Sequence, residues 1–354
     1  MSTSSRTRPG VVDFGRRADG TRAQLVTIGR SDHLLARISD HGATLVELHV
    51  PDHAGHVVDV ALGFGDVAGY ESPSNAYLGA TVGRVANRIA DATFELEGRR
   101  FELADNEPPH HLHGGGAGAF SEVPWQLVAH DADTVVLRHV SPAGDEGYPG
   151  NVEVTATYQV RDQDLVIGYR ATTDAPTPLD LTNHTYLNLR GHGDGTVLDH
   201  RLQVLADQVL VVDDGLVPTG ALAGVASTPL DLRTPTPLRE RVVALAETSA
   251  LGLDHHFVLR SEQDDVRTVA RLHDPSTGRH LEVLTDQPGL QVYSGNRLDP
   301  PVIGKDGRRY PRHGGLCLEP HHLPDAVHHP HFPSVTLEPG EVYEHTTIYR
   351  CTTI

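Results

Sequence analysis

The chain of 354 residues contains only two cysteines, Cys317 and Cys351, and no long apolar run. Two cysteines cannot form a disulfide framework, although one bridge between them stays open, so a reducing compartment fits best. The first ten residues lack the apolar core of a secretory signal. No stretch approaches the ~18 apolar residues of a transmembrane helix. These absences predict a cytoplasmic protein.

Positive charge is also scarce, because 29 lysines and arginines stand against 47 aspartates and glutamates. The formal net charge of −18 repels phosphate backbones and anionic lipid headgroups. Nucleic acids and membrane surfaces are therefore poor candidate partners, and a neutral small molecule is a better one.

Sustained helical periodicity is missing as well, whereas an apolar and polar alternation of period two recurs along the chain. The alternating stretches are rich in Val, Thr and Leu and are bounded by Gly, Pro, Asp or Asn, which is typical of short strands. The sequence therefore predicts an all-β protein, either an antiparallel sandwich or a barrel. Weak helical patterns occur at 83–90 and 238–249. Clear strand patterns occur at 134–139, 152–160, 202–212, 279–284 and 342–349.

No low-complexity linker, charged tail or internal repeat divides the chain. Residues 221–237 are rich in proline and read as a long loop, but strand-like sequence lies on both sides. We expect a single domain over residues 1–354, with residues 1–10 as a flexible terminus.

Histidine is unusually frequent, with 24 residues spread over many loops. His110, His111 and His113 precede a run of glycines, and their spacing invites a metal interpretation. Structural zinc sites use four Cys or His ligands, and catalytic sites usually use three ligands that further residues orient. The scattered histidines match neither pattern, so we expect no metal. Within the Leu-His-Gly-Gly run, His113 has room to hydrogen-bond a ligand.

Glu319 and His184 are the strongest candidates for chemistry. Glu319 ends the apolar stretch Leu-Cys-Leu, where a buried carboxylate is costly unless it is satisfied or functional. His184 lies in the polar segment Leu-Thr-Asn-His-Thr-Tyr, and an extended backbone places it on the same face as Tyr186. Considered by itself, His184 also fits a structural histidine that is buried and hydrogen-bonded. A carboxylate that accepts a proton and an imidazole that donates one suit acid/base catalysis.

Two further segments supply candidate binding residues. Residues 79–89 lack the dinucleotide fingerprint, but Asn87 and Arg88 offer donors that suit sugar hydroxyls. Arginines in surface ion pairs are the alternative interpretation of this segment. Asp254 and Gln291 can accept from and donate to adjacent hydroxyls, although each alone also fits a turn or an edge strand.

Together these segments resemble the aldose 1-epimerase, or galactose mutarotase, family. The resemblance extends from about residue 40 to the C-terminus. It implies a large antiparallel β-supersandwich with an open sugar cleft, a sugar substrate such as galactose or glucose, and no metal or organic cofactor. The motifs that carry it are, in order, Gly-Arg-Val-Ala-Asn-Arg-Ile, Leu-His-Gly-Gly, Thr-Asn-His-Thr-Tyr-Leu-Asn-Leu, Leu-Asp-His-His-Phe, Gln-Pro-Gly-Leu-Gln-Val-Tyr-Ser-Gly-Asn and Cys-Leu-Glu-Pro with Pro-Asp-Ala.

Matched by position, the resemblance implies that Glu319 is the catalytic base and His184 the catalytic acid. Glu319 would remove the C1 hydroxyl proton, while His184, protonated in the resting complex, would protonate the ring oxygen. Ring opening, rotation about C1 to C2 and reclosure then exchange the α and β anomers. The residues that fall where the family binds sugar hydroxyls are Asn87, Arg88, His113, Tyr186, Asp254 and Gln291.

The chain departs from the family pattern in two places. Thr185 and Leu187 replace the usual Ser and Phe, and His321 and His322 follow Glu-Pro where Gln and an aromatic residue are common. These departures leave the acid and base in place. They leave the preferred aldose open, because wall residues decide which hydroxyl orientation fits. Asp325, which follows a proline, is interpreted as a turn or cap residue.

Two rival functions stay open at this stage. A glycoside hydrolase would use two carboxyl groups, here Asp254 and Glu319. A non-catalytic carbohydrate-binding protein would keep the sugar contacts without needing the acid and base. A sugar-phosphate epimerase would need several cations in its cleft, and the net acidity argues against it. Either a monomer or a homodimer is expected.

Overall fold

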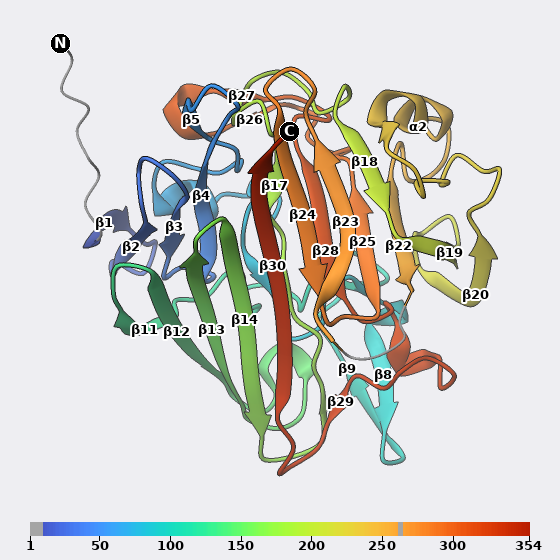
Figure 1. Ribbon diagram of the computed structural model, residues 1–354. Helices are drawn as coiled ribbons and strands as arrows, with labels where there is room; N and C mark the ends of the chain where they lie inside the picture. Colours follow the sequence, from blue (N-terminus) through green and yellow to red (C-terminus); the bar gives the residue numbers. More distant parts are fainter. Residues whose placement is uncertain (1–9, 261–264) are drawn as a thin grey trace.

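The largest sheet of the protein is antiparallel and crosses the front of the molecule (Figure 1). The computed structural model describes residues 10–260 and 265–354. The prediction of an all-β fold is confirmed. The order of the nine strands in this sheet is β11 (Gln126–His130), β12 (Thr134–Ser141), β13 (Val152–Arg161), β14 (Asp164–Thr173), β30 (Tyr343–Thr353), β24 (Arg279–Thr285), β23 (Arg267–His273), β18 (Arg201–Val204) and β21 (Thr236–Pro237).

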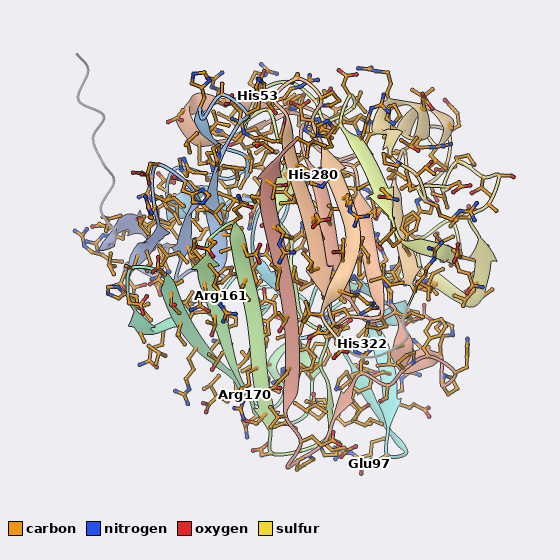
Figure 2. All side chains as sticks on the ribbon, viewed as in Figure 1. His53, Glu97, Arg161, Arg170, His280 and His322 are labelled. Atoms are coloured by element: carbon orange, nitrogen blue, oxygen red, sulfur yellow. The ribbon has the colours of Figure 1, made fainter. Side chains whose placement is uncertain are left out.

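The nine-stranded sheet has one polar and one apolar face, as the period-two pattern predicts. Along β13, Val152 and Val154 are buried while Glu153 between them is exposed. Arg161 and Arg170 are also exposed, and Figure 2 shows them on the side of the sheet that faces the viewer. The opposite face therefore supplies the apolar side chains that pack against the rest of the molecule.

Two further sheets complete the core. The five-stranded sheet follows chain order: β1 (Gly10–Arg16), β2 (Arg22–Gly29), β3 (Leu35–Ser39), β4 (Thr44–Pro51) and β5 (Val57–Asp59). The six-stranded sheet has the order β17 (Tyr186–Leu187), β28 (Leu316–His321), β25 (Gly289–Tyr293), β22 (Asp254–Leu259), β19 (Ala206–Val212) and β20 (Pro218–Gly224). One large apolar cluster joins all three sheets, and it includes Ile38, Ile167 and Leu290.

Short two-residue strands join loops that are distant in the sequence. β6 (Thr81–Val82) pairs with β16 (Thr182–Asn183), and β7 (Arg88–Ile89) pairs with β10 (His111–Leu112). These pairings bring the Asn87 and Arg88 segment beside the His113 segment and beside the segment that carries His184. The remaining elements are α1 (Val67–Tyr70), α2 (Leu238–Ala244), β8 (Thr93–Leu96), β9 (Arg99–Glu102), β15 (Thr177–Pro178), β26 (Val302–Ile303), β27 (Arg309–Tyr310), β29 (Thr336–Leu337) and four 3₁₀ turns at Ala90–Ala92, Asp145–Gly147, Lys305–Gly307 and Ala326–His328.

Three sequence-based elements need correction. The pattern at 202–212 is two strands, because β18 pairs with β23 in one sheet and β19 pairs with β22 in another. The helix expected at 238–249 ends at Ala244. The helix expected at 83–90 is absent, since Asn87 has a φ of 62°, which a right-handed helix does not allow.

Both cysteines are buried free thiols, so the bridge left open by the sequence does not form. Cys317 lies in β28 and Cys351 in β30. Among the described residues, every helix is too short or too polar to cross a bilayer.

Candidate active site

The sequence-predicted site residues converge on one cavity of about 160 Å³. Its walls come from β22, β25 and β28 and from the loops that the short strand pairs join. None of the predicted residues lies elsewhere. Those lining it are Asn87, Arg88, His113, His184, Tyr186, Asp254, Gln291 and Glu319.

Strand register explains why Glu319 points into this cavity. Along β28, Leu316 and Leu318 face the large apolar core, so Cys317 and Glu319 face the other way. Gln291 of β25 lies directly opposite Glu319. The carboxylate is therefore on the polar face of a strand whose other face is apolar, which accounts for its unusual sequence context.

His184 is held by its backbone beside the carboxylate of Glu319. Its N–H donates to the carbonyl of Ala80 at 2.9 Å, and its own carbonyl accepts from Gly79 at 2.9 Å. These bonds place Nε2 of His184 3.5 Å from Oε2 of Glu319. On the other side of the ring, Nδ1 lies 3.6 Å from Sγ of Cys317. The expected shared face of His184 and Tyr186 is also present, since their ring centroids are 5.1 Å apart.

Burial disfavours the charged form of both members of this pair. Burial lowers the pKa of His184 to about 4. Burial first, and the nearby Asp254 carboxylate second, raise the pKa of Glu319 well above its usual range. The buried position of the pair therefore favours the neutral form of each group. The expectation that His184 is protonated concerns the complex with sugar and stays a prediction.

Asn87 and His113 fix each other through their backbones. Both adopt left-handed conformations, with φ of 62° and 53°, which non-glycine residues keep only where surrounding contacts hold them. The N–H of His113 donates to the carbonyl of Asn87 at 3.0 Å. The N–H of Asn87 in turn donates to Nδ1 of His113 at 3.2 Å. Burial lowers the pKa of His113 well below its ordinary value, so the neutral ring carries its proton on Nε2 and can donate to a ligand.

Two polar pairs line the cavity. Arg88 donates to both carboxylate oxygens of Glu107, with Nε to Oε2 at 2.5 Å and Nη2 to Oε1 at 2.9 Å. Nε2 of Gln291 donates to Oδ1 of Asp254 at 2.6 Å. Burial raises the pKa of Asp254, and the positive charge of Arg88 partly offsets this rise. The side chains of these pairs already orient one another, which reduces the cost of ordering them around a ligand.

Sequence reasoning missed several residues that line the cavity. Tyr293 follows Gln291 by two positions on β25, so the period-two pattern could have found it. No sequence pattern marked Glu107 as a site residue, and only its contact with Arg88 in the structure identifies it. The Tyr77 ring lies 4.7 Å from the His113 ring, and nothing in the sequence marked it. The missed residues are Ala76, Tyr77, Glu107, Leu112, Tyr293 and Arg297.

Two other segments singled out by sequence lie outside the cavity. Asp325 accepts from the backbone N–H of Ala90 at 3.0 Å and contacts His328 at 2.7 Å, which agrees with its interpretation as a turn residue. His321 packs on His256 with ring centroids 4.6 Å apart, and its Nδ1 lies 3.4 Å from Oδ2 of Asp180. His321 therefore supports the strands behind the cavity instead of forming its wall.

The protein is thus an antiparallel β-sandwich whose cavity holds a buried carboxylate–imidazole pair. The family model described as aldose 1-epimerase matches residues 24–350. Bos taurus galactose mutarotase is 45% identical over 321 residues, covering 91% of this chain and 92% of that protein. Escherichia coli K12 aldose 1-epimerase is 36% identical over 337 residues, covering 94% and 96%.

Solved structures agree with these sequence comparisons. An aldose epimerase homologue from C. elegans superposes with a TM-score of 0.87 at 33% identity, covering 94% of this chain and 99% of that one. Galactose 1-epimerase from Lactobacillus acidophilus gives a TM-score of 0.84 at 25% identity, covering 98% and 99%. The chain therefore belongs to the aldose 1-epimerase family and is an isomerase.

Proposed function

We propose that the protein interconverts the α and β anomers of free aldohexoses, galactose foremost, with Glu319 as base and His184 as acid. The observation that carries this proposal is the 3.5 Å separation of His184 Nε2 and Glu319 Oε2 in a cavity lined by hydrogen-bonding side chains. Galactose is the first candidate substrate because relatives from Bos taurus and Rattus norvegicus, 45% and 44% identical to this chain, carry the name galactose mutarotase.

Substrate binding supplies the interactions that the empty site lacks. The C1 hydroxyl donates to Glu319, which favours the ionised carboxylate, and the ring oxygen accepts from His184, which favours the imidazolium. The complex with sugar therefore favours an ionised Glu319 beside a protonated His184.

Ring opening then follows from the positions of these two groups. Glu319 takes the proton of the C1 hydroxyl while C1 becomes a carbonyl carbon and its bond to the ring oxygen breaks. His184 gives its proton to the ring oxygen. After rotation about C1 to C2, the two proton transfers run in reverse and close the ring on the other face of the carbonyl.

The binding residues hold the open chain during this rotation. Nε2–H of His113 and the guanidinium of Arg88 are donors to sugar oxygens, and Asp254 accepts from a hydroxyl. The Arg88 contact with Glu107 and the Gln291 contact with Asp254 keep these groups in place. Holding the open form in the cavity prevents its loss to water before the ring closes again.

Polarimetry starting from pure α-galactose tests the proposal. Glu319→Gln should reduce the enzymatic rate by about a hundredfold to ten-thousandfold, because the base is lost while the shape is kept. Glu122→Gln is the matched control, since Glu122 is partly buried and does not line the cavity. A Glu319→Gln rate within about twofold of the unmodified protein would contradict the assignment. Release of reducing sugar from an oligosaccharide would instead favour a hydrolase.

A further inference from the structure

His184, Cys317 and Glu319 form a compact group of metal-ligating side chains, of which His184 and Glu319 line the cavity. One candidate ligand atom from each residue lies within 4.8 Å of the others. All three residues are buried. Cys317 and Glu319 are separated by one residue on β28 and so share a strand face, while His184 approaches from the segment between β16 and β17.

The spacing of these atoms suits a small tetrahedral ion. Zn²⁺ binds imidazole nitrogen, thiolate sulfur and carboxylate oxygen at bond lengths that place neighbouring ligand atoms about 3.3–3.8 Å apart. The nearest contacts are 3.5 Å from Glu319 Oε2 to His184 Nε2 and 3.6 Å from Cys317 Sγ to His184 Nδ1. These contacts use different ring nitrogens and one ion binds only one of them, so binding requires the thiol or the carboxylate to move toward the nitrogen that the other contacts.

Charge also favours a cation at this point. In the described part of the chain, no lysine or arginine pairs with Glu319, and the neighbouring carboxylate of Asp254 adds negative potential. His184 and Glu319 line the cavity, so an ion that enters from solvent reaches them directly. Three protein ligands and a fourth position that faces the cavity match the coordination of an exchangeable zinc site.

A second group of candidate ligands, Glu47, His49 and Asp59, offers a contrast. Its carboxylates are already occupied by protein cations: Arg37 donates to Glu47 at 2.8 Å, and Lys305 donates to Asp59 at 2.5 Å. The ammonium of Lys305 repels an added metal ion. Among the described residues, a carboxylate with no lysine or arginine partner therefore distinguishes the group of His184, Cys317 and Glu319.

We propose that His184, Cys317 and Glu319 bind one soft divalent cation, Zn²⁺ or Cd²⁺, and that the bound ion inhibits the enzyme. The inhibition rests on the proposed function, because the ion occupies the imidazole nitrogen and the carboxylate assigned as acid and base. The ion binding itself does not depend on that assignment. Sugar and metal compete for the same two side chains.

Direct binding is tested by titrating the full-length protein with Cd²⁺ and recording the ultraviolet charge-transfer band of a cadmium thiolate. This band reports only on sulfur ligands, so binding at the many histidines does not contribute. The unmodified protein should show a saturable band with one ion per chain, and excess galactose should weaken it. Absence of the band in the folded, unmodified protein overturns the proposal.

The two cysteines provide a matched pair of variants. Cys317→Ala should lose the band, and Cys351→Ala should keep it, because Cys351 is an equally buried thiol outside this group. A band that persists in Cys317→Ala or disappears in Cys351→Ala contradicts the site. Thermal unfolding checks that both variants fold. If Cys317→Ala does not fold, the proposal is tested by competition between galactose and Cd²⁺ in the unmodified protein. A cadmium band that galactose leaves unchanged overturns the proposal.

Inhibition is measured separately by polarimetry with Zn²⁺. Zn²⁺ should slow anomer exchange by the unmodified protein and by Cys351→Ala, and a chelator should restore the rate. Cys317→Ala should require at least about tenfold more Zn²⁺ for the same inhibition. Equal sensitivity of all three proteins contradicts the proposal. If the proposed function is wrong, the metal-free protein does not accelerate mutarotation, yet the cadmium band and its dependence on Cys317 remain.

Discussion

Nε2 of His184 lies 3.5 Å from Oε2 of Glu319, and both side chains are buried. Burial disfavours the charged form of each group, lowering the pKa of His184 and raising that of Glu319. Under the proposed function, hydrogen bonds from a bound sugar offset this cost.

The raised pKa of Glu319 predicts a stability gain from removing its charge. A carboxyl whose folded pKa is raised contributes stability below its unfolded pKa and loses it as pH rises through the folded pKa. Glu319→Gln should therefore increase the free energy of unfolding by about 1 kcal/mol or more at pH 8 and by less at pH 5.5. Urea denaturation at the two pH values measures the difference.

The exposed Glu153 provides the control for that measurement. Its ion pair with Arg138 lowers its pKa, so Glu153→Gln should produce no gain at pH 8. A Glu319→Gln variant that is less stable than the unmodified protein at pH 8 would show that the carboxylate is stabilised by its surroundings.

Buried histidines predict acid destabilisation. Burial lowers the pKa of His41 to about 4, and both of its ring nitrogens lack hydrogen-bond partners in the described structure. The unfolded chain binds a proton near pH 6.5 that the folded form takes up only near pH 4, so stability falls as pH drops through this window. His41→Leu should remove about 2 kcal/mol of the loss between pH 7 and pH 5.

Urea denaturation at pH 7 and pH 5 measures this effect. The variant should still lose some stability as the pH falls, because other buried histidines remain. Burial also lowers to about 4 the pKa values of His184, His200 and His255. Substitution of the exposed His130 by Leu is the control and should leave the slope unchanged. An identical pH dependence in His41→Leu and the unmodified protein would contradict the prediction.

The contact between Gln291 and Asp254 predicts an effect on sugar binding. Asp254→Asn removes the negative charge and one of the two acceptor oxygens, while the remaining amide oxygen can still accept from Nε2 of Gln291, which now donates at 2.6 Å. We expect KM for galactose to rise by about tenfold or more, with a smaller change in kcat, because the proton-transfer pair is untouched. Initial rates by polarimetry over a range of galactose concentrations separate the two parameters. A large loss in kcat at unchanged KM would instead place Asp254 in the chemistry.

The hydrogen bonds of Arg84 predict that its substitution lowers the stability of the protein and leaves its activity unchanged. Its buried guanidinium donates to the carbonyls of Ser141, Pro142 and Pro149. Arg84→Met leaves these acceptors without a donor, and the free energy of unfolding should fall by about 3 kcal/mol or more. The rate of anomer exchange at 15 °C should stay near that of the unmodified protein, since Arg84 does not line the cavity.

The control for Arg84 is Arg138, which makes an exposed ion pair with Glu153. Arg138→Met should cost at most about 1 kcal/mol. Urea denaturation measures both variants. Equal losses in the free energy of unfolding would show that the carbonyl contacts of Arg84 contribute little to stability.

The strand pattern and the residue types of the site were readable from the sequence because both are local. The alternation in residues 152–160 follows from which side chains face the core of one strand, and β13 appears as expected. The pattern at 202–212 is wrong in detail, because a strand that crosses from one sheet to another keeps its local periodicity. Arg84 and Arg88 share one motif, yet one holds buried carbonyls and the other lines the cavity.

The sequence by itself determined the all-β class and, through its motifs, predicted a candidate acid, a candidate base and candidate sugar contacts, because these depend on residue type and short-range order. The tertiary structure decided the proximity of His184 to Glu319 and of Cys317 to both, since separate chain segments carry the histidine and the other two residues. It also decided the direction in which the pKa values of His184 and Glu319 shift. A pKa depends on burial and neighbouring charge, and neither exists until the chain has folded.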